Sequence, residues 1–230
     1  AVPLMVYVVG VRSPHIAIGT SALAVAANAL AGLANHARAH NVNWRCGGAY
    51  ALAGVAGAFA GSSFGKAFDG QKLLFLFALL MIVVAVLMYR SRHGEGVEGV
   101  ICNRDNFPKV AGFGLGTGAL SGFFGIGGGF LIVPGLIAST SMPIYRAIGT
   151  SLVAVSAFGL TTALNYAASG LIDWPLAASF IGGGIAGSLL GTRVSRRLAA
   201  EKGTLNAMFA TLVLGVAVYM LTKSWFALQG

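Results

Sequence analysis

The residues most suited to binding a ligand form the run GIGGG at 125–129, which is followed by an apolar stretch that contains Pro134. Each glycine in a helix interior costs about 1 kcal/mol relative to alanine, so Gly127, Gly128 and Gly129 together predict an interrupted helix. Interrupted backbone survives at membrane depth only where it is buried in protein or lines a polar cavity. A helix that restarts there points free N–H groups and a positive dipole end into the cavity, which suits an anion. The alternative is that the glycines only allow close helix packing.

Hydroxyl side chains follow glycine in the same tripeptide at two places, Gly19-Thr20-Ser21 and Gly149-Thr150-Ser151. Threonine and serine can donate hydrogen bonds to an oxyanion or cap the start of a helix. For either tripeptide alone, capping is the stronger interpretation. The repetition puts a binding site on an equal footing with capping, because a pseudo-symmetric site takes one contribution from each half of a chain.

Two asparagines, Asn35 and Asn165, occupy matched positions near predicted helix ends. They are candidate substrate-binding residues, although a hydrogen bond between helices is the more economical interpretation. Trp44 and Trp174 begin the following predicted helices, as is typical of anchors at a membrane interface. Glycines that recur every three or four residues on one helix face predict close packing for two sets: Gly54, Gly57, Gly61 and Gly184, Gly187, Gly191.

The elements that carry these residues are apolar. Of 230 residues, 57% are hydrophobic, 9% are charged and 34 are glycine, whereas soluble domains have roughly 25% charged residues. The mean hydropathy is +0.81. A membrane-spanning helix needs about 20 apolar residues. The apolar segments therefore predict an all-α, multi-pass membrane protein, with segments at 13–37, 45–64, 71–89, 111–140, 147–172, 174–192 and 204–222.

The chain contains an internal repeat with an offset of 130 residues. The sequence AIGTS at 17–21 recurs at 147–151, and the same offset pairs Asn35 with Asn165. Such duplication is common in transporters. We divide the chain into repeat one at 1–89, a cytoplasmic linker at 90–109 and repeat two at 110–230. By this alignment we expect the first element of repeat one, the counterpart of the glycine run, to be missing from the sequence.

The placement of basic residues predicts how the two halves are oriented. Suppose that 111–140 enters the membrane and returns as two re-entrant helices, 111–124 and 127–140, each about 21 Å long and too short to span it. The linker, Arg146 and the cluster around Arg196 then all lie in the cytoplasm, as the positive-inside rule requires, while Lys66 and Lys72 lie outside. Each half then crosses the membrane an odd number of times, which predicts two inverted repeats.

Charge and motifs exclude several classes of function. The net charge is +9, but the basic residues lie between apolar segments, which indicates a positive-inside bias and no nucleic-acid partner. All six acidic residues lie at segment ends or in loops, which argues against a buried proton relay. Hydrolase and phosphate-loop signatures and metal-ligand spacings are missing, so we expect no catalytic residue, metal or cofactor. Cys46 and Cys102 are expected to be free structural thiols.

The sequences SGFFGIGGGFLIVPGL at 121–136 and YRAIGTSLVAV at 145–155 resemble the signature of the TauE/SafE family of sulfite and organosulfur-anion exporters. The resemblance covers nearly the whole chain. It implies two related halves, each with a glycine-rich segment ending in a proline and a following GTS helix. It also implies transport of small anions such as sulfite, sulfoacetate or thiosulfate. By this match the residues that line the path are Gly127, Gly128, Gly129, Pro134, Thr150, Ser151, Thr20 and Ser21.

Together these observations predict an exporter of small sulfur-containing anions, such as sulfite or organosulfonates, in a bacterial inner (plasma) membrane. The expected partners are the anionic substrate and the lipid bilayer, and a homo-oligomer is left open. Two alternatives also stay open. One is a transporter or channel for another small solute, and the other is a membrane enzyme that acts on a sulfur compound.

Overall fold

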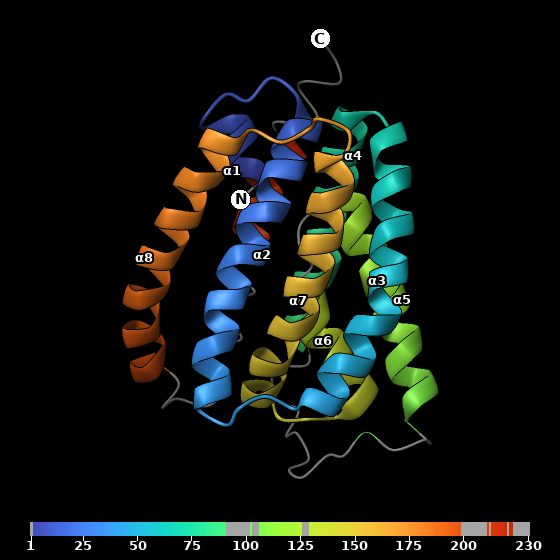
Figure 1. Ribbon diagram of the computed structural model, residues 1–230, viewed down its shortest axis with the longest axis vertical. Helices are drawn as coiled ribbons and strands as arrows, with labels where there is room; N and C mark the ends of the chain where they lie inside the picture. The colour runs from blue at the N-terminus through green and yellow to red at the C-terminus, as the bar shows by residue number, and fades with distance from the viewer. Residues whose placement is uncertain are drawn as a thin grey trace. The chain divides into compact units, whose positions relative to one another are not determined.

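The computed structural model describes residues 2–90, 102, 106–125, 129–198, 211, 213–219 and 221–222. All regular elements in these ranges are helices, which confirms the predicted all-α class (Figure 1). The helices are α1 Val2–Tyr7, α2 Pro14–Arg38, α3 Trp44–Ala67, α4 Gly70–Arg90, α5 Phe107–Phe124, α6 Gly129–Thr140, α7 Ile144–Ala167 and α8 Trp174–Leu198.

Helix length and composition fit a membrane protein. Among the described residues, three helices are long and apolar enough to cross a membrane, Pro14–Arg38, Gly70–Leu87 and Ile144–Ala167. Their bounds lie within a few residues of the predicted segments. Large apolar side chains are also exposed on α3, including Leu52, Phe59 and Phe64, as expected of a surface that faces lipid.

The chain forms two compact units. The first comprises Ala1–Ala67 and Glu95–Gly182 and contains α1, α2, α3, α5, α6, α7 and the first residues of α8. The second comprises Phe68–Gly94 and Gly183–Gly230 and contains α4 and the rest of α8. Every candidate site residue belongs to the first unit.

Helices α3 and α5 pack backbone against backbone. A Cβ added to Gly57 would meet the carbonyl oxygen of Leu115, and one added to Gly61 would meet that of Ala119. Residue numbers rise together on both helices, so the two helices are parallel (Figure 1). The predicted close packing is confirmed for the set Gly54, Gly57 and Gly61. In the second set, Gly187 has no described atom within 4 Å of an added Cβ.

Helices α2 and α7 pack against each other and run in opposite directions (Figure 1). Helix α7 also packs against α3 and α6. The core between them contains Tyr50 and Phe158, whose rings stack with centroids 6.4 Å apart. The antiparallel pair therefore places the start of α2 beside the end of α7, and the start of α7 beside the end of α2.

Candidate functional site

The predicted break in the glycine-rich segment is present. Helix α5 ends at Phe124, and Gly125 caps it in the left-handed conformation, with φ of 63°. Glycine suits this position because it has no Cβ to clash with the backbone. Helix α6 begins at Gly129. Gly127 and Gly128 lie outside the described residues, so the role of their N–H groups stays a prediction.

Helix α5 is longer than the sequence predicted. It begins at Phe107 rather than near residue 111, and Pro108 lies in its first turn, where the missing N–H of proline has no cost. Its 18 residues correspond to a length of about 27 Å. The first of the two short helices is thus almost as long as the bilayer core is thick, about 30 Å.

Helix α6 carries the predicted site residue Pro134 inside the helix. Proline has no N–H, so one carbonyl in the preceding turn loses its helical donor. The neighbouring Gly135 allows close approach of the Tyr50 side chain, whose hydroxyl shares a 2.8 Å hydrogen bond with the Thr117 hydroxyl. At the start of α6, a Cβ on Gly129 would lie 3.7 Å from Val155 of α7. These contacts hold α6 against α3, α5 and α7.

Thr20 and Thr150, which are equivalent in the repeat, make equivalent hydrogen bonds. The Thr20 hydroxyl accepts a 2.9 Å hydrogen bond from the backbone N–H of Asp173. The Thr150 hydroxyl accepts a 3.0 Å hydrogen bond from the backbone N–H of Asn43. Asp173 and Asn43 are themselves separated by the repeat offset of 130 residues. Each fully buried threonine therefore holds the residue just before a helix of the other half.

The glycines of the two tripeptides make equivalent contacts as well. A Cβ on Gly19 would meet the carbonyl oxygen of Leu171, and one on Gly149 would meet that of Asn41. Leu171 and Asn41 are again separated by 130 residues. Any larger residue would push these loops away, so both positions require glycine for packing.

The two serines are buried next to these threonines. Ser21 and Ser151 are both buried, and the Ser151 hydroxyl donates to the carbonyl of Ile148 on its own helix at 2.7 Å. The GTS tripeptides thus fix the contact between α2, α7 and the loops before α3 and α8. A contact between these residues and a substrate stays a prediction.

The matched asparagines have different surroundings. Asn165 donates to the Ser62 hydroxyl at 2.6 Å, so the interpretation as a hydrogen bond between helices is confirmed at this position. Asn35 is exposed near the end of α2. The structure therefore brings Asn165, but not Asn35, into a cluster of side chains.

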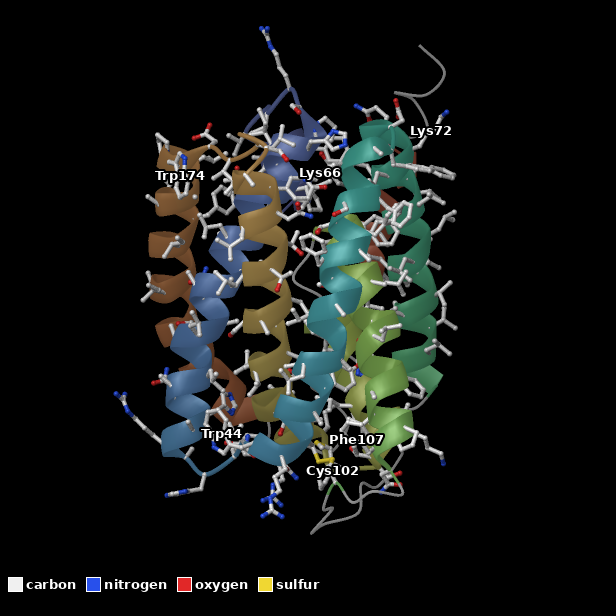
Figure 2. All side chains as sticks on the ribbon, turned by 45° about the vertical axis from the view of Figure 1, so that its right-hand side comes forward. Trp44, Lys66, Lys72, Cys102, Phe107 and Trp174 are labelled. Atoms are coloured by element: carbon white, nitrogen blue, oxygen red, sulfur yellow. A yellow bond between two sulfur atoms is a disulfide. The ribbon has the colours of Figure 1, made fainter. Side chains whose placement is uncertain are left out.

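Lys66 also belongs to this cluster, although no motif in the sequence points to it. Its ammonium donates to the side-chain oxygen of Asn165 at 2.8 Å, to the backbone carbonyl of Asn165 at 3.2 Å and to the Ser169 hydroxyl at 2.9 Å. It also lies 5.9 Å from the centre of the Tyr166 ring. The only signal in the sequence was a lysine near the end of an apolar segment. Its position between α3 and α7 is visible in Figure 2.

The prediction of free thiols is wrong. Cys46 and Cys102 form a disulfide across 56 residues of sequence, with Cα atoms 5.4 Å apart. Spacing along the chain could not show this, because a disulfide depends on how close the two Cα atoms lie in the fold. The bond ties Cys102, which precedes α5, to the first turn of α3 (Figure 2).

The two ends of the first unit carry different labelled groups in Figure 2. Trp44, Cys102 and Phe107 lie at one end, and Lys66 and Trp174 lie at the other. Both tryptophans are exposed, 57% for Trp44 and 63% for Trp174. Residues that are equivalent in the repeat therefore reach opposite ends, each in a position suited to a membrane interface.

A profile of the family described as "Sulfite exporter TauE/SafE" matches residues 1–220. The chain belongs to the TauE/SafE family. It is 52% identical over 234 residues to a "Probable membrane transporter protein" of Xylella fastidiosa, covering 99% of this chain and 88% of the relative. Proteins with the same designation in Methanocaldococcus jannaschii and Bacillus subtilis are 26% and 23% identical, over 89% and 88% of this chain and 78% and 80% of the relatives. No solved structure matches the chain.

Membership of the TauE/SafE family, the designations of the relatives and the apolar helices together establish the general activity. The protein is an integral membrane protein that acts in membrane transport. The resemblance seen in the motifs is thus confirmed.

Proposed function

We propose that this TauE/SafE protein exports small sulfur-containing anions, such as sulfite or organosulfonates, and that it is a carrier rather than an enzyme. The family description supports the substrate class. The Xylella relatives are bacterial, which supports location in a bacterial inner membrane. Carriers bind their substrate near the middle of the membrane, between related halves.

The observation that carries this proposal is the matched pair of hydrogen bonds from Asp173 to Thr20 and from Asn43 to Thr150. Because α2 and α7 are antiparallel and each bond joins the two halves, the pair has the arrangement expected of a two-fold rotation. This supports two inverted repeats, in which alternating access arises as one half moves against the other. Because a hydroxyl that accepts a hydrogen bond still carries its own donor, both threonines can hold a loop and also donate to an anion.

The break between α5 and α6 supports the choice of an anion. A helix that starts within the membrane directs N–H groups and a positive dipole end toward any space beside it. We assign Gly127, Gly128 and Gly129 to this role. The hydroxyls of Thr20 and Ser21 and those of Thr150 and Ser151 lie toward opposite ends of the unit, and we assign them to the path of the anion on either side of the break. Pro134, Gly149, Gly19, Asn165 and Asn35 shape the surroundings in this proposal.

The charge distribution supports an orientation. The end of the first unit that carries Trp44 also carries Arg38, Arg45, Lys109 and Arg146, and the positive-inside rule assigns such an end to the cytoplasm. The Cys46–Cys102 disulfide lies at this end too and weighs against the orientation, because disulfides are rare in a reducing cytoplasm. A membrane potential that is negative inside favours the exit of an anion by about 2.3 kcal/mol per charge and 100 mV. Export driven by this potential therefore requires no proton-carrying carboxylate.

Flux through proteoliposomes tests the function. Vesicles are loaded with labelled sulfite, thiosulfate, sulfoacetate or sulfate, and the potential is set with a potassium gradient and valinomycin. We expect efflux of at least one sulfur anion well above that of empty liposomes, increased by an inside-negative potential, with the compound recovered unchanged. Gly149→Leu should abolish it, because the Asn41 carbonyl occupies the required space. Gly116→Ala, which meets no described atom within 4 Å, is the matched control.

Three outcomes contradict the proposal. If none of the four anions moves but an amino acid or a cation does, the protein carries another solute. If the anion leaves as a different compound, the protein is an enzyme. If flux survives Gly149→Leu at the level of Gly116→Ala, the contact between the repeats does not support transport.

A further inference from the structure

Three hydroxyl groups are fully buried and have no hydrogen-bond partner among the described residues: those of Ser121 on α5 and of Thr162 and Tyr166 on α7. Buried polar side chains are normally paired, so an unpaired one indicates a missing partner such as a ligand or water. Several buried donors without partners in one region are therefore a candidate binding site.

The contacts of α2 bring the three hydroxyl-bearing residues into one region. The side chain of Ile18 meets the position of a Cβ on Gly125, which lies one turn after Ser121. The next residue, Gly19, approaches the Tyr166 side chain, with an added Cβ 2.8 Å from that of the tyrosine. Thr162 lies one turn before Tyr166 on α7, about 6 Å along the helix. Gly125 and Tyr166 thus both contact the start of α2, and Ser121 and Thr162 lie one turn away from them on α5 and α7.

A positive charge lies beside this region. The Lys66 ammonium is 5.9 Å from the centre of the Tyr166 ring. Its three hydrogen-bond acceptors, two oxygens of Asn165 and the Ser169 hydroxyl, are all neutral. The carboxylate of Asp173, at the same end of the unit, accepts the N–H of Leu176 at the start of α8. Lys66 therefore has a charge that its hydrogen-bond partners do not neutralise, and such a charge attracts anions.

We propose that the hydroxyls of Ser121, Thr162 and Tyr166 form an anion subsite beside Lys66 that takes a small oxyanion. The inference rests on the proposed function and adds a second binding position, between the helix break and the end of the unit that carries Lys66. Hydroxyl donors suit an oxyanion because each of its oxygens accepts hydrogen bonds. Under the proposed orientation, the anion passes this subsite on its way out of the cell.

Variants that remove one hydroxyl at nearly constant shape test the subsite: Ser121→Ala, Thr162→Val and Tyr166→Phe. The matched control is Thr161→Val, because the Thr161 hydroxyl already donates to the Ala157 carbonyl on its own helix at 2.8 Å. We expect the KM for the transported anion to rise about tenfold in Thr162→Val and Tyr166→Phe, the effect of losing one hydrogen bond to a charged group. Lys66→Gln should raise the KM similarly, whereas Lys66→Arg should retain most of the affinity.

A second measurement separates binding from folding. The melting temperature of the purified protein is recorded with and without sulfite, because a ligand that binds the native state raises it. Without the anion, the hydroxyl variants should melt at or above the wild-type temperature, since they remove unpaired buried groups. With sulfite, the wild type and Thr161→Val should be stabilised, and Thr162→Val and Tyr166→Phe should be stabilised much less.

The outcomes distinguish this inference from the proposed function. If the wild type transports a sulfur anion but Thr162→Val and Tyr166→Phe keep the KM of the control, the hydroxyls hold water and the subsite is wrong while the function stands. If the variants melt well below the wild type without anion, the hydroxyls are structural and the subsite is also wrong. If the wild type moves none of the four anions, the proposed function fails and the subsite fails with it.

Discussion

The hydroxyl of Thr150 accepts a hydrogen bond from the backbone N–H of Asn43, 107 residues earlier in the chain. The contact is repeated at the opposite end of the unit, where Thr20 accepts from Asp173. In both cases the donor is the residue just before a helix, α3 or α8, and the acceptor is fully buried. Each half of the chain therefore secures a loop of the other half.

This relationship predicts that Thr20→Val and Thr150→Val both destabilise the protein. Each leaves a backbone N–H without its acceptor, which costs about 1–3 kcal/mol. Because the two sites are far apart, the losses should add in the double variant. The measurement is the melting temperature in detergent, with Thr161→Val as the control for loss of a hydroxyl within a helix. A stable Thr20→Val beside an unstable Thr150→Val would contradict the equivalence of the two contacts.

The packing of α3 on α5 predicts opposite effects for two neighbouring glycines. A Cβ on Gly118 would meet the carbonyl oxygen of Gly54, so Gly118→Ala forces the helices apart and should cost about 1–3 kcal/mol. Gly116 has no described atom within 4 Å of such a Cβ, so Gly116→Ala should stabilise the helix by roughly 0.5–1 kcal/mol. Thermal unfolding of both variants checks this. Equal effects would show that the backbone contact is not as close as described.

The disulfide predicts a pattern of thiol labelling. In protein purified without reductant and then denatured, Cys46 and Cys102 should resist a polyethylene-glycol maleimide, and both should react after reduction. Reduction should also lower the stability by roughly 4 kcal/mol, because the bond closes a loop of 56 residues. Labelling of both thiols before reduction would overturn the assignment.

The proposed orientation predicts which loops can be labelled from outside a cell. In a Cys46→Ser, Cys102→Ser background, single cysteines are introduced by Ala39→Cys after α2 and by Ala168→Cys after α7; both positions are exposed. A membrane-impermeant maleimide should label the Ala168→Cys variant in intact cells and the Ala39→Cys variant only after lysis. Labelling of both from outside contradicts the opposite placement, and the reverse pattern contradicts the orientation.

The sequence predicted the features that depend on local composition. The bounds of α2 and α7, and the interruption at Gly125, follow from apolar length and from the helix-breaking tendency of glycine. The predicted start of α5 lies too late in the chain, because Lys109 ends a polar stretch in the sequence although Pro108 fits the first turn of a helix.

The features that sequence reasoning missed depend on distant contacts. Lys66 meets Asn165 across 99 residues, and Cys46 meets Cys102 across 56. Neither pair has a local pattern, since only the folded arrangement of α3, α5 and α7 brings them together. The repetition of the GTS tripeptide singles out Thr20 and Thr150, but their contacts with the loops before α8 and α3 become visible only in the fold.

The glycine contacts between α3 and α5 have a consequence for motion. Where two backbones touch, no side chain lies between them that could change its rotamer, so sliding one helix along the other would drive carbonyls into Cα atoms at Gly57, Gly61 and Gly118. Helices α3 and α5 must therefore move as one rigid body during a transport cycle. Hinges have to lie elsewhere in the unit, and Gly125 at the end of α5 and Pro134 inside α6 are two positions where the backbone can bend.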